Sequence, residues 1–129
     1  MFEQLSNLHK LCFPEKPWSA VEFQNLKNSG CEIICSDHGF IVYRTVADEA
    51  EIISLGVHPD FRGQGIASAM LALLGSELKK PSIINKVFLE VKSNNDAAIR
   101  LYKASGYITV GARPKYYDGI DGVIMSKTI

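Results

Sequence analysis

A glycine-bearing loop contains the residue types best suited to binding a ligand. The segment Arg62-Gly63-Gln64-Gly65-Ile66-Ala67 follows a strand-like apolar run and leads directly into residues with helical spacing. Such a loop points backbone amides and the positive end of a helix at whatever lies there, and glycine lets a phosphate approach closely. The loop therefore predicts a pyrophosphate site, with a tight strand-to-helix turn that binds nothing as the alternative.

Two common nucleotide-binding motifs do not match this loop. A Walker loop has Lys followed by Ser or Thr after its last glycine, whereas Ile66-Ala67 stands there. A dinucleotide fingerprint requires G-x-G-x-x-G, and that spacing is absent here. Both motifs are therefore disfavoured.

A carboxylate further along the chain is a candidate general base. Apolar residues alternate through Lys86–Lys92, which predicts a strand with Glu90 on the same face as Phe88. A carboxylate on a partly apolar face is expected to have a raised pKa and to accept a proton. The alternative is a solvated Glu90 that pairs with Lys92.

A tyrosine on the next predicted helix is a candidate proton donor. Asn95 is expected to cap a helix that runs to about Ala104. Tyr102 lies seven residues after Asn95, which is two helical turns, so both side chains project to the same side. The alternative is that Tyr102 is an aromatic packing residue beside Ala98 and Leu101.

The elements that must position these residues predict an α/β fold within one domain of residues 1–129. The first three strands form an antiparallel meander, the two strands flanking the third helix form a parallel pair joined by a crossover, and the last two form a hairpin. Tyr116 and Tyr117 are expected in the loop of that hairpin. The predicted helices are residues 2–12, 19–29, 65–80 and 95–104; the predicted strands are 31–36, 39–46, 51–57, 86–92, 107–112 and 122–127.

Composition excludes several classes of partner. Fourteen basic and fourteen acidic residues cancel, and no basic run marks a nucleic-acid or membrane surface. No apolar stretch approaches the roughly 20 residues of a membrane span, and no signal peptide is recognisable. Three histidines without ligand spacing predict no metal site. We therefore expect a cytoplasmic protein that binds neither nucleic acid nor membrane.

The cysteines agree with a reducing compartment. Their number is three, which is odd, and no disulfide framework is apparent. Cys31 and Cys35 fall in one predicted strand, where four residues span about 13 Å, too far for a disulfide. We expect them to be thiols in the core.

The loop and the segments around it resemble a known family. Arg62-x-x-Gly65-x-Ala67 after Leu55-Gly56-Val57-His58-Pro59 resembles the acetyl-CoA signature of the GCN5-related N-acetyltransferases (GNAT). The segment LEVKSNNDAAIRLYKASGY from Leu89 to Tyr107 resembles the RimI-like branch, the ribosomal-protein alanine N-acetyltransferases. The resemblance covers about residues 8–127. One departure is that relatives usually have a strand before the first helix, which here begins at Phe2, so one sheet edge is expected to be shorter.

The resemblance implies acetyl-CoA as cosubstrate and assigns roles along the chain. The strand before the loop offers backbone groups to the pantetheine arm, the loop holds the pyrophosphate, and the capping asparagine lies near the thioester. Glu90 matches the general base and Tyr102 the general acid. The implied cofactor-binding residues are Leu55, Gly56, Val57, Arg62, Gly63, Gln64, Gly65, Ile66, Ala67, Ser68 and Asn95.

The resemblance also implies an acceptor. Trp18, Tyr116 and Tyr117, with the loop from Arg113 to Gly119, are expected to line a groove for a protein N-terminus. The expected reaction is acetyl transfer to an N-terminal amine, with a ribosomal protein as the expected acceptor. Two alternatives stay open: an acetyltransferase for a small amine or a lysine side chain, and a catalytically silent acyl-CoA-binding regulatory module.

Overall fold

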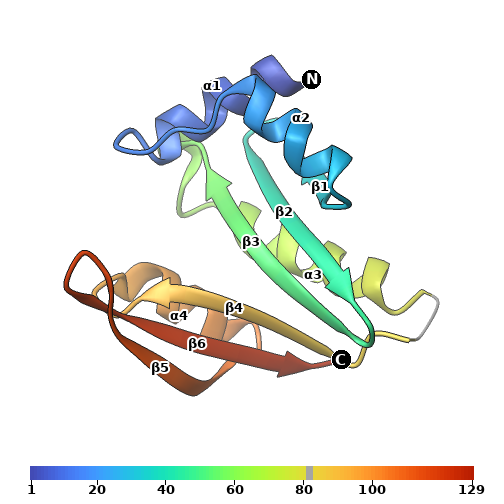
Figure 1. The fold of residues 1–129 in the computed structure, drawn as a ribbon, viewed down its shortest axis with the longest axis vertical. Coiled ribbons are helices and arrows are strands. Elements are labelled where there is room, and N and C mark those ends of the chain that lie inside the picture. The colour runs from blue at the N-terminus through green and yellow to red at the C-terminus, as the bar shows by residue number, and fades with distance from the viewer. Residues whose placement is uncertain (81–82) are drawn as a thin grey trace. The chain divides into compact units, whose positions relative to one another are not determined.

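The structure of the chain is a computed structural model that describes residues 1–80 and 83–129 (Figure 1). Pro81, expected to help terminate the third helix, lies outside the described residues. The helices are α1 (Phe2–Cys12), α2 (Ala20–Asn28), α3 (Ile66–Leu78) and α4 (Asp96–Ala104), with a 3₁₀ turn at Pro59–Phe61. The strands are β1 (Glu32–Cys35), β2 (Gly39–Val46), β3 (Glu49–Val57), β4 (Lys86–Lys92), β5 (Ile108–Tyr117) and β6 (Ile120–Thr128).

The strands follow the predicted mixed topology. Their order in the sheet is β1-β2-β3-β4-β6-β5, and β3 pairs with β4 in parallel while β6 pairs antiparallel with both β4 and β5. The helix between the parallel strands is α3, as expected. Helices and strands follow one another in the order that the hydrophobic periodicity predicts, and the α/β fold class is confirmed. The four-residue strand β1 lies at one edge of this sheet.

The C-terminal hairpin differs from the prediction. Tyr116 and Tyr117 lie in strand β5 and not in a loop, because the hairpin turns within Asp118-Gly119. Both turn residues have positive φ (48° and 91°), the conformation that a tight two-residue turn requires. Pro114 does not end the strand, since β5 is an edge strand and proline is tolerated there. The expected loop from Arg113 to Gly119 is therefore too long, because residues 113–117 belong to β5 and only Asp118-Gly119 forms the turn.

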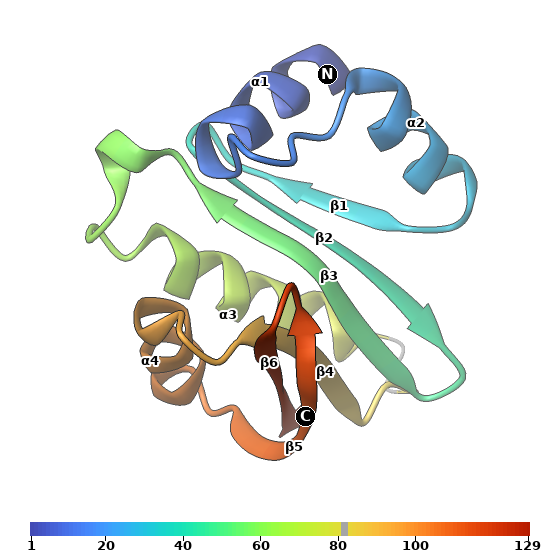
Figure 2. The same cartoon turned by 60° about the vertical axis from the view of Figure 1, so that its left-hand side comes forward.

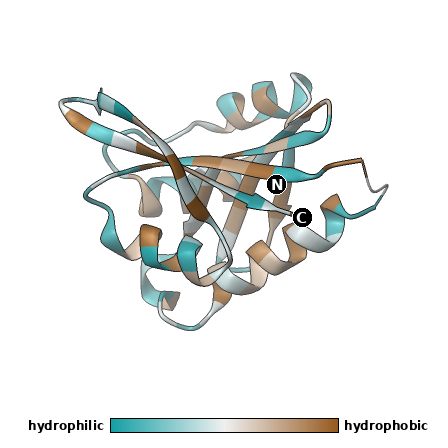
Figure 3. Ribbon diagram, turned by 90° about the horizontal axis from the view of Figure 1, so that it is seen from below, coloured by the Kyte–Doolittle hydropathy of each residue, from teal (hydrophilic) through white to brown (hydrophobic). Residues whose placement is uncertain are grey.

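The chain divides into two compact units. The first unit comprises Met1–Arg44 and Ile53–Met70, and the second comprises Thr45–Ile52 and Leu71–Ile129. Hydropathy colouring shows apolar segments along the strands and both colours along the helices (Figure 3), the pattern of elements with one buried face.

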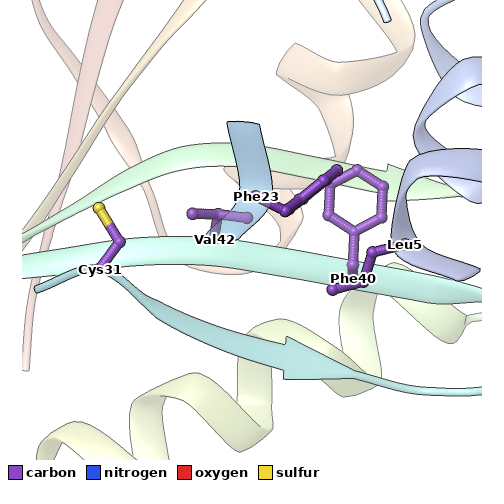
Figure 4. Packing of buried hydrophobic residues seen from close by; sticks show 5 residues of the cluster. All are labelled: Leu5, Phe23, Cys31, Phe40 and Val42. Carbon is purple, nitrogen blue, oxygen red and sulfur yellow. The ribbon is translucent and has the colours of Figure 1, made fainter. Parts of the chain in front are cut away.

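The core of the first unit forms where α1 and α2 pack against β1 and β2 (Figure 2). Phe23 of α2 lies edge-on to Phe40 of β2, with a ring separation of 6.2 Å (Figure 4). Ser19 begins α2 with a capping box, in which its hydroxyl accepts the Glu22 N–H and the Glu22 carboxylate accepts the Ser19 N–H. The buried cluster consists of Leu5, Phe23, Cys31, Phe40 and Val42.

The second unit is built on β4, β6 and β5, which lie side by side with α4 over one face (Figure 1). Val87, Leu89 and Val91 are buried on one face of β4, as the alternation predicts. The opposite face of β4 presents Phe88 and Glu90, so the strand places Glu90 away from the aliphatic core.

All three cysteines are free thiols. Cys31 is buried, but Cys35 is exposed, so the expectation of a core thiol is wrong for Cys35. The reason is that Cys35 is the last residue of an edge strand, where only one neighbouring strand covers the backbone. None of the helices in the described part of the chain has the length and hydropathy of a membrane span.

Candidate functional site

The glycine loop of the first unit is open and exposed. Gly63 and Gly65 have φ of +78° and +79°, and a Cβ added to either would meet nothing within 4 Å. The Ala69 N–H donates to the Gly65 carbonyl at 3.0 Å, which is the first hydrogen bond of α3. The amides of the three residues before Ala69 therefore have no partner within the helix. This geometry suits an anion bound by backbone N–H groups.

Arg62 ties this loop to the end of β3. Its Nε donates to the Val57 carbonyl at 3.1 Å, and the Cys12 thiol donates to the same oxygen at 3.3 Å. These two donors occupy both lone pairs of the Val57 carbonyl. The pantetheine contact implied for Val57 stays a prediction. The Val57 carbonyl has no lone pair left to accept a hydrogen bond from pantetheine.

Gly56 has a packing reason to be glycine. A Cβ at this position would lie 2.8 Å from the Phe40 ring and 3.0 Å from the Cys12 sulfur. A larger residue would therefore push apart β3, the core ring beneath it and the end of α1. This close packing explains the residue without a ligand, so Gly56 alone is no evidence for pantetheine binding.

In the second unit, Glu90 forms an ion pair that the sequence did not predict. Arg113 of β5 places its Nε 3.1 Å from Glu90 Oε1. Lys92, the partner considered from sequence, lies instead over the ring of Tyr117 at 5.7 Å. Glu90 Oε2 is buried and has no hydrogen-bond partner. Glu90 is therefore not a solvated surface carboxylate, because its side chain is only 18% exposed.

Asn95 and Tyr102 take the positions that the helical spacing predicts. Asn95 Oδ1 accepts the Ala98 N–H at 3.2 Å and caps α4. Tyr102 is 8% exposed and lies edge-on to Tyr107, with ring centroids 5.8 Å apart. Burial raises the pKa of Tyr102 to about 12, so its hydroxyl keeps its proton at neutral pH. Tyr102 is thus a packed aromatic residue with a protonated hydroxyl.

The three aromatic residues expected to line the acceptor groove have different surroundings. Trp18 belongs to the first unit, where it is half-buried and stacks on His9 with rings 4.5 Å apart. Tyr116 is 55% exposed and lies under the Arg113 guanidinium, 4.6 Å from the ring centroid. Burial and then the charge of Glu90 raise the pKa of Tyr117. The structure therefore brings Tyr116 and Tyr117 into one cluster with Glu90.

The ion pair of Arg113 with Glu90 and the contact of Lys92 with Tyr117 could not be predicted from the sequence. Both lie opposite Gly122 of β6, Lys92 on one side and Arg113 on the other. Lys92, Gly122 and Arg113 are neighbours across three strands, and the sequence alone does not give the register that aligns them. Within the described residues, His, Cys, Asp and Glu side chains form no group of three or more suited to a metal ion.

Comparisons with known proteins identify the family. The model of the acetyltransferase (GNAT) family matches residues 2–107. The [ribosomal protein bS18]-alanine N-acetyltransferase of Escherichia coli strain K12 is 37% identical over 83 residues, which cover 64% of this chain and 55% of that protein. The chain thus matches about half the length of this curated relative. The Salmonella typhimurium enzyme of the same name is 31% identical over 111 residues, covering 82% of this chain and 74% of that protein.

A solved structure agrees with these sequence matches. The crystal structure of the ribosomal-protein-S18-alanine N-acetyltransferase from Escherichia coli superposes with a TM-score of 0.87 at 28% identity. The superposition covers 99% of this chain and 87% of that one. Fold, signature loop and sequence similarity lead to the same conclusion: the chain belongs to the acetyltransferase (GNAT) family and is RimI-like.

Proposed function

We propose that this chain is an acetyl-CoA-dependent N-acetyltransferase that acetylates a protein N-terminal amine, with a ribosomal protein as acceptor. Residues 1–129 act as one acetyltransferase domain in this proposal. The observation that carries it is the open glycine loop at the start of α3, where Gly63 and Gly65 leave backbone amides accessible. Relatives named as N-acetyltransferases of a ribosomal protein alanine support the choice of acceptor. The free thiols suit the reducing cytoplasm.

The residues of the first unit fit the phosphate part of acetyl-CoA. The loop from Gly63 to Ser68 offers N–H groups at a helix N-terminus, which suits a pyrophosphate. Leu55 and Gly56 of β3 precede the loop and are proposed to bind the pantetheine arm through their backbones. In the second unit, the Asn95 oxygen is used by the helix cap, but its side-chain amide retains N–H donors for the cofactor. Acetyl-CoA, when bound, supplies the activated acetyl thioester.

Glu90 is the proposed general base. The acceptor must be a neutral amine, and an α-amino group has a pKa of about 7.7–8.0 against about 10.4 for lysine. At pH 7 deprotonation therefore costs about 1 kcal/mol for an N-terminus and about 4–5 kcal/mol for lysine, at about 1.36 kcal/mol per pK unit. A single carboxylate acting directly or through one water is sufficient for the smaller cost. This difference favours an N-terminal acceptor over a lysine side chain.

Tyr102 is the proposed proton donor to the departing thiolate. Its pKa of about 12 keeps the hydroxyl protonated throughout the neutral range. A thiol has a pKa of about 8.5, so complete proton transfer from Tyr102 is uphill by about 5 kcal/mol. A hydrogen bond from the hydroxyl carries no such cost and still stabilises the developing charge. We therefore assign Tyr102 chiefly to hydrogen-bond donation in the transition state.

A peptide panel tests the proposed function. Peptides that begin with Ala, Ser, Met or Gly are offered with free and with blocked N-termini, together with radiolabelled acetyl-CoA. We expect label only in peptides with a free α-amine. Equal labelling of blocked peptides that contain lysine would favour the lysine acetyltransferase. Binding of acetyl-CoA with no labelling of any peptide or small amine would favour the silent regulatory module.

A further inference from the structure

The ion pair between Glu90 and Arg113 spans an intervening strand. Glu90 lies on β4 and Arg113 on β5, and β6 runs between them. Adjacent strands lie about 4.8 Å apart, so the two backbones are separated by roughly 9.6 Å. The Arg113 Nε nevertheless lies 3.1 Å from Glu90 Oε1. The two side chains therefore meet across the surface of β6.

Gly122 is the residue of β6 that lies beneath this crossing. It stands opposite Arg113 on one side and opposite Lys92 on the other. A Cβ at Gly122 would collide with Glu90 Oε2 and would lie 3.1 Å from Glu90 Cδ. Its φ is outside the left-handed region, so side-chain space, and not backbone conformation, requires glycine here.

The environment of the two carboxylate oxygens is unequal. Oε1 accepts from Arg113, whereas Oε2 lies over Gly122, buried and without a hydrogen-bond partner. A buried acceptor without a donor is costly, and the protein atoms around Oε2 leave that cost unrelieved. The unused capacity of Oε2 suits a donor that arrives with the substrate, and an amine N–H or a relay water has that chemistry.

We propose that Gly122 and Arg113 are positioning residues for Glu90, Gly122 by providing the space over β6 and Arg113 by holding Oε1. This inference rests on the proposed function, because it assumes that Glu90 accepts the proton of the acceptor amine. Arg113 is 54% exposed, so the ion pair adds little to stability, and its value lies in the orientation of the carboxylate.

The test compares two glycines of the same hairpin. Gly122→Ala introduces the colliding Cβ, whereas Gly111→Ala is a matched control whose Cβ would approach Ile124 no closer than 3.7 Å. We measure kcat and the KM for acetyl-CoA over a range of pH. We expect Gly122→Ala to lower kcat at neutral pH about tenfold or more, to regain rate as pH rises, and to leave the KM for acetyl-CoA within about twofold. Gly111→Ala should behave as wild type.

A double variant separates positioning from general damage. If Gly122 acts through Glu90, adding Gly122→Ala to Glu90→Gln causes no further loss of kcat. An additional tenfold loss in the double variant, or an equal loss in Gly111→Ala, would overturn the inference. Wild-type pH dependence of Gly122→Ala would overturn it too.

Arg113 provides a second variant should Gly122→Ala fail to fold. Arg113→Gln is expected to lower kcat and to shift the pH dependence toward that of Glu90→Gln, while Arg113→Lys retains more activity. A faster Arg113→Gln enzyme would mean that the ion pair blocks Glu90, and the positioning role would be wrong.

A ligand-free readout keeps this inference distinct from the proposed function. In the NMR spectrum, the Arg113 Nε–H is expected to be protected from solvent exchange in wild type and Gly111→Ala, and unprotected in Glu90→Gln. It should also lose protection in Gly122→Ala. If this pattern is observed but wild type transfers no acetyl group, the proposed function is wrong while the arrangement of Glu90, Arg113 and Gly122 is supported. If wild type is active but the Arg113 Nε–H stays protected in Gly122→Ala, the positioning role of Gly122 is wrong.

Discussion

At the scale of single residues, Glu90 is the side chain on which the proposed chemistry depends most. It lies on the non-core face of β4, 18% exposed, with one oxygen on Arg113 and the other unpaired. The alternation of Lys86–Lys92 was sufficient to predict the strand and the face. Its ion-pair partner was not predictable, because Arg113 is brought to Glu90 by a strand register two strands away.

Replacing Glu90 with glutamine tests the general base. Glu90→Gln should lower kcat at neutral pH about 100-fold or more, because the amide cannot accept the amine proton. Raising the pH should restore part of the rate, since more of the acceptor amine is then already neutral. The measurement is kcat against pH at saturating substrates, with circular dichroism as the control for folding. A profile that matches wild type in shape and height would reduce Glu90 to a structural carboxylate.

Tyr102→Phe tests the hydrogen-bond donation assigned to the Tyr102 hydroxyl. The change removes one oxygen and preserves the packing against Tyr107, so fold and acetyl-CoA affinity should be retained. Turnover should fall by about 10²-fold, measured as single-turnover transfer at saturating acetyl-CoA and peptide. A rate within about threefold of wild type would assign Tyr102 to packing alone.

At the scale of elements, the packing of α1 and α2 on β2 places a histidine in the core of the first unit. His9 is 2% exposed, its Nδ1 accepts the Trp18 N–H at 3.0 Å, and its ring stacks on Trp18. Burial lowers the pKa of His9 below its usual 6.5. This unit is therefore built around a neutral imidazole.

His9 makes the stability of the first unit dependent on pH. The unfolded chain binds the proton more readily than the folded one, so the stabilisation is complete above about pH 6.5 and is lost as pH falls toward the lower pKa of the folded state. Lowering the pH from about 7.5 to about 5 should decrease the thermal midpoint of wild type, and should decrease that of His9→Gln less steeply. Identical pH slopes for the two proteins would contradict a neutral buried His9.

Element order was predictable because each segment has a clear period. The bounds of β4 match the prediction, and α2 begins after its N-cap Ser19, where the predicted helix starts. The hairpin strands were predicted too short, because the sequence does not show that β5 is an edge strand, which accommodates Pro114, or that Asp118-Gly119 alone makes the turn. The cysteine environment also depended on which strand lies at the edge, a property of the assembled sheet.

The glycine loop offers a test at the same scale. Gly65→Glu places a carboxylate and a Cβ at φ +79°, so it adds backbone strain and repels a pyrophosphate. Gly30→Glu is a matched control, because Gly30 also has positive φ (+101°) and a Cβ there would meet nothing within 4 Å. Gly30 differs in that it follows the end of α2 and lies outside the glycine loop. In calorimetric titration Gly65→Glu should lose acetyl-CoA binding while Gly30→Glu retains it. Unchanged affinity of Gly65→Glu would remove the loop from the cofactor site.

At the scale of the whole molecule, family membership, the parallel pair and the C-terminal hairpin were accessible from the signature and the periodicity, whereas the place of β6 between β4 and β5 was not predicted. The acceptor is harder to predict from the sequence, because Trp18 belongs to one unit and Tyr116 and Tyr117 belong to the other. The two tyrosines of the second unit also make cation–π contacts that no local sequence pattern reveals. Arg113 lies over Tyr116, and Lys92 lies over Tyr117. The acceptor assignment therefore needs a direct chemical measurement.

That measurement is the position of the acetyl group after a single turnover. A peptide with a free N-terminal alanine and one internal lysine is incubated with excess enzyme and acetyl-CoA, and fragmentation mass spectrometry locates the modification. The account predicts acetylation of the α-nitrogen in wild type, with the lysine unmodified and with Glu90→Gln at least about 100-fold slower at neutral pH. Acetyl groups on the lysine, or α-nitrogen acetylation that is equally fast in Glu90→Gln, would contradict it.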